Sequence, residues 1–202
     1  MSVDEKDSEM SVEVEEEVIQ NPISYLKEIF KVLIISLLII VPVRLYLFQP
    51  FIVEGDSMLP NFHNREYLIV DEISYRFREP QRGDVVIFHP PDNPKTYYIK
   101  RVIGLPGEGV EMKNGKVYIY NKDFPDGTLL PEADYLPQAG VRETVQVDLK
   151  YDQYYVLGDN RNNSSDSRVF GAITKEEIRG KAFLRAFPFD KFTIFEPINY
   201  LF

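Results

Sequence analysis

The feature that most constrains the fold of this 202-residue chain is an apolar segment near its start, residues 29–48. As an α-helix at ~1.5 Å per residue, such a segment would be about 30 Å long, which equals the thickness of the hydrocarbon core of a bilayer. Lys31 and Arg44 interrupt it close to its two ends, where long basic side chains can reach the headgroups. Pro42 would kink the last turns, which membrane helices tolerate. We therefore expect a membrane-spanning helix over residues 28–48.

Two other interpretations of this segment remain open. A buried helix of a soluble domain is possible because the charge-free run, residues 32–43, is only 12 residues long. A cleaved leader fits less well, because an acidic segment precedes the run and no small-x-small site follows it. Lys27 and Lys31 flank the N-terminal side, which favours an uncleaved anchor with a cytoplasmic N-terminus and an extracytoplasmic remainder.

The negative charge of the chain is concentrated before this segment. Residues 1–20 hold eight acidic residues and one lysine, a balance of −7 out of a net charge of −9. This charge density predicts a solvated, disordered tail over residues 1–27. Residues 21–202 carry only −2, which argues against nucleic acid as a partner, since phosphate binding needs a basic face.

The absence of cysteine limits the possible chemistry. Without it the chain forms no disulfide, no thiolate metal site and no cysteine nucleophile. The two histidines, His63 and His89, have no neighbouring histidine at ligand spacing. We expect neither a metal nor a cofactor.

After residue 48 the sequence changes to short apolar runs divided by turn residues, which predicts a β-rich domain over residues 49–202. Asn114-Gly115 is typical of a type I′ hairpin turn, and only residues 174–178 indicate a helical turn. The Pro-, Asp- and Gly-rich residues 121–150 are interpreted as an insertion. The expected strands are mostly antiparallel and cover residues 67–70, 84–88, 97–103, 112–117, 144–149, 154–157 and 181–187.

The C-terminal region is rich in aromatic residues. Core packing of the last strands explains them most simply, and contact with a bilayer interface is the alternative. The residues are Phe183, Phe187, Phe189, Phe192, Phe195, Tyr200 and Phe202.

Ser57 lies in a turn, Gly55–Pro60, where glycine and proline can hold its side chain in one orientation. A serine becomes a nucleophile only when a base removes its proton. His63 follows by only six residues and His89 precedes two prolines, so a Ser-His-Asp triad is a weak alternative. A lysine can replace histidine if desolvation lowers its pKa from about 10.4 to about 7–8.

Lys100 is the candidate base, because it lies inside the apolar strand at residues 97–103. Strand alternation places Lys100 and Arg101 on opposite faces, so we expect one of the two to be buried, and lysine neutralises more easily than arginine. An exposed Lys100 on an edge strand is the alternative. The polar loop at residues 158–168 is either a solvated surface loop or a source of carboxylates and hydroxyls for these bases.

Four blocks in this order resemble bacterial type I signal peptidase, a membrane-bound peptidase with a Ser–Lys dyad. The resemblance covers residues 48–171 and is specific because all four blocks follow an N-terminal apolar segment. The blocks are Gly55–Pro60, Arg82–Val86, Tyr98–Glu108 and Gly158–Arg168.

The resemblance implies that Ser57 attacks the scissile carbonyl and that neutral Lys100 accepts its proton and later returns it to the leaving amine. The backbone N–H of Ser57 would lie in the oxyanion hole. Gly55 stands where some members carry a serine or threonine as a second oxyanion donor, so that side-chain donor is missing here. Met58 would pack against the dyad, and the hydroxyl of Ser164 would bond the lysine amine.

The resemblance also implies two ion pairs behind the site, Asp159 with Arg101 and Asp166 with Arg168. Its fold would be two antiparallel sheets, with the substrate added as a β-strand beside a cleft. The implied partners are membrane lipid and exported preproteins, which would be cut after small-x-small sequences to remove their signal peptides.

Two alternatives from other classes remain. A soluble Ser–Lys regulator that cleaves itself shares the chemistry, but it would need a DNA-binding N-terminal half, where this chain has its apolar segment. A non-catalytic, membrane-tethered β-module that captures extended peptides would share the fold without the reaction.

Overall fold

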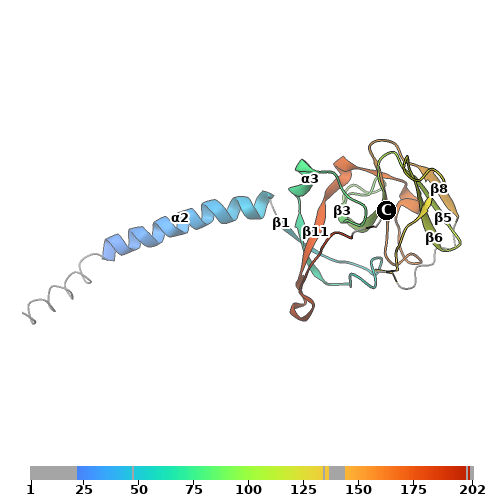
Figure 1. Cartoon of the computed structure of the whole chain (residues 1–202). Coiled ribbons are helices and arrows are strands. Elements are labelled where there is room, and N and C mark those ends of the chain that lie inside the picture. The colour runs from blue at the N-terminus through green and yellow to red at the C-terminus, as the bar shows by residue number, and fades with distance from the viewer. Residues whose placement is uncertain (1–21, 47, 134, 137–143, 199, 201–202) are drawn as a thin grey trace, which may run out of the picture. The chain divides into compact units, whose positions relative to one another are not determined.

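A computed structural model describes residues 22–46, 48–133, 135–136, 144–198 and 200. The chain divides into two compact units, residues 1–45 and residues 46–202. Most of the predicted acidic tail and the terminal Phe202 lie outside the described residues. The first unit contains one described helix, and the second contains all described strands (Figure 1).

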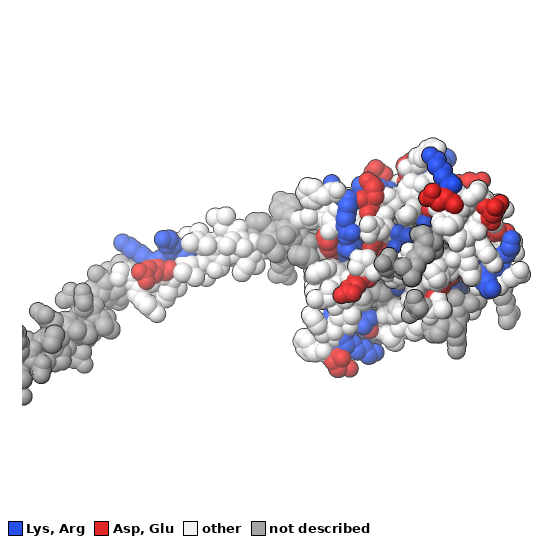
Figure 2. Space-filling view, viewed as in Figure 1, with Lys and Arg blue, Asp and Glu red and all other residues white. Residues whose placement is uncertain are grey.

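The apolar segment forms helix α2, Pro22–Tyr46, of 25 residues. Large apolar side chains are exposed along it from Tyr25 to Val41, and Figure 2 shows charged side chains gathered toward one end. Within the described part of the chain, no helix has both the length and the apolar character required to cross a membrane. A helix is present where one was expected at residues 28–48, but it begins at Pro22, so residues 22–27 of the predicted disordered tail are helical, and it ends at Tyr46. Its membrane-spanning role stays a prediction.

The larger sheet of the second unit has eight antiparallel strands in the order β1-β2-β11-β3-β4-β9-β10, with β12 paired to β11. This order places β3 and β4 in its interior and β1 at an edge. The strands are β1 (Phe48–Ile52), β2 (Tyr67–Asp71), β3 (Val85–Phe88), β4 (Tyr98–Gly104), β9 (Gln153–Leu157), β10 (Ile173–Thr174), β11 (Ile178–Phe187) and β12 (Thr193–Ile194).

The smaller antiparallel sheet has four strands in the order β7-β6-β5-β8. They are β5 (Gly109–Lys113), β6 (Lys116–Tyr120), β7 (Thr128–Leu129) and β8 (Val145–Asp148). Asn114 and Gly115 have φ values of 52° and 76°, so the predicted hairpin turn is confirmed. The mainly β fold with two antiparallel sheets is also confirmed.

The residues interpreted as an insertion, 121–150, contribute to the smaller sheet. They supply β7 and β8, which are the two outer strands of the smaller sheet. β8 confirms the strand expected at residues 144–149, whereas β7, which has only two residues, was not predicted. The segment therefore completes the fold.

Short helices connect the strands, and one of them matches the helical turn expected at residues 174–178. The 3₁₀ helix η1, Lys175–Glu177, begins with a capping box in which Glu177 and Thr174 satisfy each other's backbone N–H groups. The other short helices are α3 (Ser74–Phe77), α4 (Ser167–Phe170) and the 3₁₀ helix η2 (Phe189–Lys191).

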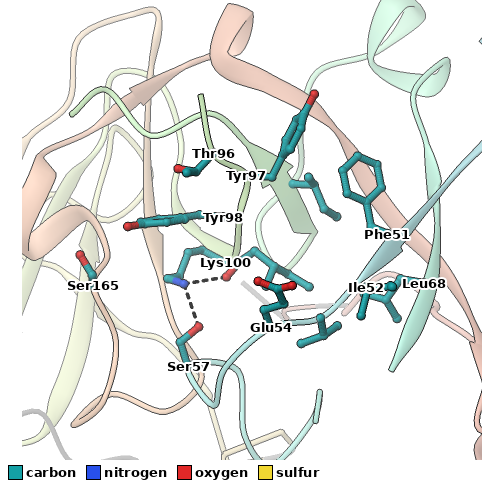
Figure 3. A pocket seen from close by; sticks show the side chains of 13 residues that line it. Phe51, Ile52, Glu54, Ser57, Leu68, Thr96, Tyr97, Tyr98, Lys100 and Ser165 are labelled. Atoms are coloured by element: carbon teal, nitrogen blue, oxygen red, sulfur yellow. Dashed lines mark hydrogen bonds between the residues drawn. The ribbon is translucent and has the colours of Figure 1, made fainter. Parts of the chain in front are cut away.

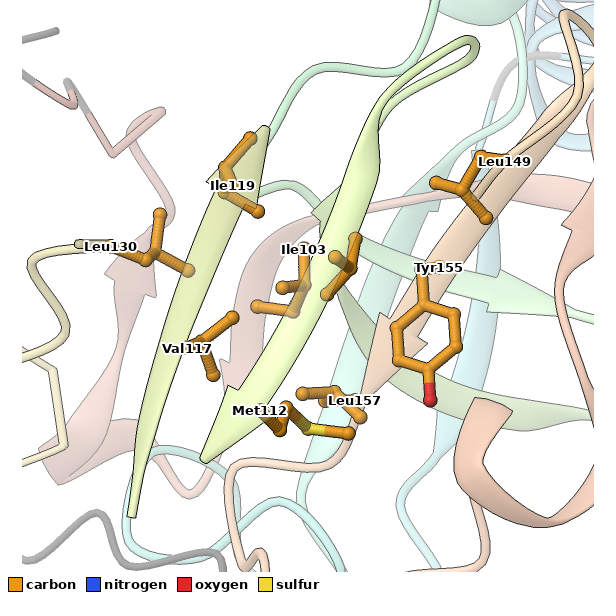
Figure 4. Close-up of a cluster of buried hydrophobic side chains, with 9 residues drawn as sticks. Ile103, Met112, Val117, Ile119, Leu130, Leu149, Tyr155 and Leu157 are labelled. Carbon is orange, nitrogen blue, oxygen red and sulfur yellow. The ribbon is translucent and has the colours of Figure 1, made fainter. Parts of the chain in front are cut away.

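One hydrophobic cluster joins the two sheets (Figure 4). Gly104 lies at the end of β4 beside this cluster, where a Cβ atom would come within 2.5 Å of Val110 and 2.7 Å of Leu149. Only glycine lets the chain pass from one sheet to the other at this distance. The cluster contains Ile103, Val110, Met112, Val117, Ile119, Leu130, Leu149, Tyr155 and Leu157.

Two further clusters cover opposite faces of the larger sheet. Side chains alternate along β3, so that Val85 and Ile87 join one cluster while Val86 and Phe88 join the other. The neighbouring strand β4 is consequently covered on both faces as well. This explains why both Lys100 and Arg101 are buried, at 4% and 5% exposure, where the strand pattern predicted burial of only one.

The C-terminal aromatic residues divide into two groups. Phe195 packs against Phe62, with ring centroids 4.8 Å apart, as core packing predicts. Phe187, Phe189 and Phe192 are exposed, and Phe187 makes edge-to-face contact with Phe189. Core packing is therefore confirmed for Phe195, whereas contact of the exposed rings with a bilayer interface stays a prediction.

Met112 is 0% exposed and belongs to the cluster drawn in Figure 4, which packs the smaller sheet against the larger one. We expect Met112→Ala to lower the free energy of unfolding by about 2–5 kcal/mol, because it leaves a cavity between the sheets. Urea unfolding of the two proteins measures this difference. Lys113→Ala, one residue further along β5 and exposed, is the control and should change the free energy by less than about 1 kcal/mol. Equal effects of both substitutions would contradict this assignment of the core.

Candidate active site

Ser57 lies on the connection between β1 and β2, in a turn that is fixed at both ends. Gly55 has a φ of 87°, a conformation that favours glycine, and its N–H donates to Asn64 Oδ1 at 3.2 Å. Met58, the next residue, is buried in the core, and its expected packing against the dyad stays a prediction. The carbonyl of Ser57 accepts a hydrogen bond of 2.9 Å from the backbone N–H of Asn160. The serine is therefore held by the core on one side and by the loop at residues 158–168 on the other.

Lys100 lies on β4, and its side chain meets Ser57 (Figure 3). The distance from Lys100 Nζ to Ser57 Oγ is 2.8 Å, and Nζ also donates to the carbonyl of Ile99 at 2.8 Å. The predicted juxtaposition of the two residues, 43 positions apart in the sequence, is thus present. Lys100 is not on an edge strand, because β4 lies between β3 and β9.

The environment of Lys100 favours its neutral form. Burial lowers the pKa of the amine from 10.5 to about 8, and the more distant charges of Asp166 and Asp159 oppose this only in part. An amine with this pKa is substantially neutral near pH 8. It is consequently able to accept a proton from the hydroxyl 2.8 Å away.

Arg101, the next residue on β4, has a carboxylate partner on the opposite face. Its Nε and Nη2 donate to the two oxygens of Asp159 at 2.8 and 2.6 Å, and its Nη1 donates to the carbonyl of Gly83 at 2.9 Å. Burial alone would lower the pKa of Arg101, but the hydrogen bonds and charge of Asp159 raise it above its ordinary value. Asp159 also accepts from Asn61 Nδ2 at 2.8 Å. The expected ion pair is therefore formed.

Asp166 accepts hydrogen bonds from other residues of the polar loop at residues 158–168. Its carboxylate accepts two hydrogen bonds of 2.8 Å from Arg168 and one of 3.0 Å from the N–H of Gly158. Arg168 also donates to the carbonyl of Arg161 at 2.7 Å. This second expected ion pair fixes the shape of the loop that contacts Ser57.

Ser164 lies beside the dyad without the contact expected of it. Its Oγ is buried and has no hydrogen-bond partner among the described residues, whereas the Lys100 amine bonds Ser57 and Ile99. Gly158 brings Ser164 close, since a Cβ atom at Gly158 would lie 2.1 Å from Ser164 Oγ and 2.6 Å from the carbonyl oxygen of Ser57. The requirement for glycine at position 158 was not foreseen from the sequence.

The sequence interpretation also missed Arg161 and its partner Glu132, which form a buried ion pair. Arg161 Nη1 donates to Glu132 at 3.0 Å, and Arg161 Nε donates to the carbonyl of Gly158 at 2.9 Å. Tyr135 adds a hydrogen bond of 2.8 Å to Glu132 and places its ring 4.4 Å from the Arg101 guanidinium. Residues 121–150 thus contribute to the polar network behind the dyad.

Ser57 and Lys100 are among the residues that line a cleft of about 470 Å³. Most of its lining is apolar, and the only charged side chains among the lining residues are those of Glu54 and Lys100. The lining residues are Phe51, Ile52, Val53, Glu54, Ser57, Leu68, Ile87, Thr96, Tyr97, Tyr98, Ile99, Lys100 and Ser165.

This arrangement can perform acyl transfer. A hydroxyl with an adjacent amine base inside a cleft is suited to attack a carbonyl carbon. Among the described residues, no group of histidine and carboxylate side chains is arranged to hold a metal ion.

Comparison with known proteins gives one consistent result. Residues 26–187 match the family described as signal peptidase, peptidase S26. Probable signal peptidase I-1 of Synechocystis sp. PCC 6803 is 36% identical over 84% of this chain and 87% of its own length. Signal peptidase I S of Bacillus subtilis strain 168 is 36% identical over 80% of this chain and 89% of its own length. A crystal structure of signal peptidase I from Enterococcus faecalis V583 is 29% identical and has a TM-score of 0.42, covering 52% of this chain and 97% of that one. This chain belongs to the signal peptidase family, peptidase S26.

Proposed function

We propose that this chain is a membrane-bound serine endopeptidase that removes N-terminal signal peptides from exported preproteins, with Ser57 as nucleophile and Lys100 as general base. The observation that supports this most directly is the distance of 2.8 Å between Ser57 Oγ and the amine of the buried Lys100. Family membership supports the same reaction.

In the proposed mechanism, the neutral Lys100 amine takes the proton of Ser57 as Oγ attacks the carbonyl carbon. The peptide C–N bond then breaks, and the protonated amine of Lys100 gives its proton to the leaving nitrogen. Lys100 then takes a proton from water as the water oxygen attacks the acyl-serine carbonyl carbon. The ester C–O bond breaks, and Lys100 returns the proton to Ser57 Oγ. The backbone N–H of Ser57 stabilises the oxyanion, and Gly55 adds no side-chain donor.

The positions of the other site residues support positioning roles. Met58 holds the nucleophile turn in the core, and Asp159 with Arg101 joins the polar loop to β4. Asp166 with Arg168 fixes the loop itself. Ser164, whose buried Oγ has no partner among the described residues, is the hydroxyl proposed to hydrogen-bond the Lys100 amine.

The cleft supports an extended substrate cut after small-x-small residues. Its apolar lining is suited to small apolar side chains, and β1 at the edge of the larger sheet is available for pairing with a substrate strand. A β-module that only captures peptides would need this cleft but not the contact between Ser57 and Lys100. That contact favours the enzyme.

Helix α2 is proposed as the membrane anchor, with the N-terminus cytoplasmic and the peptidase unit extracytoplasmic. Its 25 residues would extend about 37 Å, and its large apolar side chains are exposed from Tyr25 to Val41. The exposed rings of Phe187 and Phe189 are suited to the membrane interface. Preproteins and lipid are thus the proposed partners.

The dyad is tested by single substitutions. Ser57→Ala should abolish cleavage of a preprotein with an Ala-x-Ala site, and Lys100→Ala should lower kcat by about 10²–10⁴-fold, because each removes one half of the proton transfer. Gel-based cleavage rates measure the effect, with circular dichroism to verify folding. Lys150→Ala, at an exposed lysine, is the control and should retain full activity. Full activity in either dyad variant would contradict the mechanism.

The lysine base predicts a particular dependence on pH. Because the pKa of Lys100 is lowered to about 8 and only the neutral amine accepts a proton, kcat/KM should rise with pH and reach half its plateau near pH 8. At pH 6 the rate should be about 100-fold below the plateau, since each unit below the pKa reduces the neutral fraction tenfold. Initial rates on a peptide without ionisable groups measure the profile. A flat profile from about pH 6 to 10 would exclude a lysine base.

The anchor is tested by fractionation. The full chain should remain in the membrane pellet after an alkaline carbonate wash, because a spanning helix is held by its apolar surface and not by charge. A variant with Leu33, Ile34 and Leu37 changed to lysine should move to the supernatant. Release of the unaltered chain by the wash would show that α2 does not span the membrane.

A further inference from the structure

Glu54 is the one acidic side chain among the residues that line the cleft. Figure 3 shows its carboxylate in the cleft, between the Ser57–Lys100 pair and Ile52 in this view. The side chain is exposed, and it forms no ion pair or hydrogen bond with any other residue that the structure describes. A carboxylate with no structural partner inside a substrate cleft is available to a ligand.

Glu54 is not among the groups that shift the pKa of Lys100, the proposed base. The carboxylates that act on the Lys100 amine are Asp166 and Asp159, which lie on the polar loop. Neither does Glu54 hold the nucleophile turn, since that turn is fixed through Gly55, Met58 and Asn160. A change at Glu54 therefore leaves the catalytic geometry in place.

The position of Glu54 sets its reach along a bound substrate. It precedes Ser57 by three residues, so their Cα atoms are at most about 11 Å apart. An extended substrate advances about 3.3 Å per residue from the bond that Ser57 attacks. Glu54 is consequently in reach of substrate side chains within three residues of the cut.

We propose that Glu54 is a specificity-determining residue, whose carboxylate binds a basic substrate side chain within three residues of the cut and disfavours an acidic one there. This inference rests on the proposed function. The mostly apolar lining around Glu54 strengthens the charge interaction, and its exposure to solvent limits it. The expected discrimination between lysine and glutamate at the responsive position is about tenfold in kcat/KM.

The test uses the full chain in detergent micelles and a set of cleavage-site peptides. Each peptide carries lysine, glutamine or glutamate at the second position before the cut or at one of the three positions after it. Each keeps small residues one and three places before the cut and is otherwise neutral. The unaltered chain should prefer lysine over glutamate about tenfold at one position or more, and about 0.5 M salt should reduce this preference. Glu54→Gln should reduce it below about twofold, and Glu54→Lys should reverse it.

Asp126→Asn is the matched control, because it removes one negative charge at an exposed residue that does not line the cleft. It should leave the preference unchanged. Equal cleavage of all three peptides at every position by the unaltered chain would overturn the role of Glu54 alone. A preference that persists in Glu54→Gln would also overturn it. Failure to cleave the glutamine peptides would instead contradict the proposed function, and this inference with it.

Discussion

The buried ion pair between Arg101 and Asp159 is the interaction on which the rest of the site depends. Arg101 belongs to β4, the strand that carries Lys100, and Asp159 belongs to the loop whose backbone contacts Ser57. The pair therefore fixes the strand of the base relative to the loop that holds the nucleophile. Removing one partner would leave an uncompensated buried charge, which typically costs about 3–5 kcal/mol. Both buried charges are compensated by the two hydrogen bonds of the pair. The carbonyl of Gly83 accepts a further hydrogen bond from Arg101, and Asn61 donates one to Asp159.

Lys100 and Arg101 show how one strand can give two adjacent cations opposite properties. Both are buried, because the larger sheet is covered on both faces. Arg101 meets a carboxylate and its pKa is raised, whereas Lys100 meets a hydroxyl and its pKa is lowered to about 8. The difference lies in the partner that each face supplies. A fixed charge that organises the site and a neutral base that acts in it can thus occupy neighbouring positions.

The sequence was sufficient for features that local patterns determine. Asn114-Gly115 predicted the hairpin, and the ordered blocks predicted that Ser57 and Lys100 would meet and that Asp159 would pair with Arg101. The sequence was insufficient where a contact or the burial of a side chain depends on residues far away in the chain. Glu132 lies 29 residues before Arg161 in a segment without periodicity, so nothing in the sequence linked them. Burial of both bases on β4 depends on two covering layers, which the pattern of one strand cannot reveal.

The lowered pKa of Lys100 has a consequence for the reagents that this protein would react with. An amine that is partly neutral near pH 8 is itself a nucleophile, whereas an exposed lysine with a pKa of about 10.4 is almost entirely protonated at that pH. Lys100 Nζ and Ser57 Oγ are 2.8 Å apart, and both residues line one cleft. An aldehyde or activated ester placed there meets two competing nucleophiles, one forming an imine or amide and the other a hemiacetal or ester. Covalent probes of this cleft can therefore be directed to nitrogen or to oxygen by the choice of electrophile.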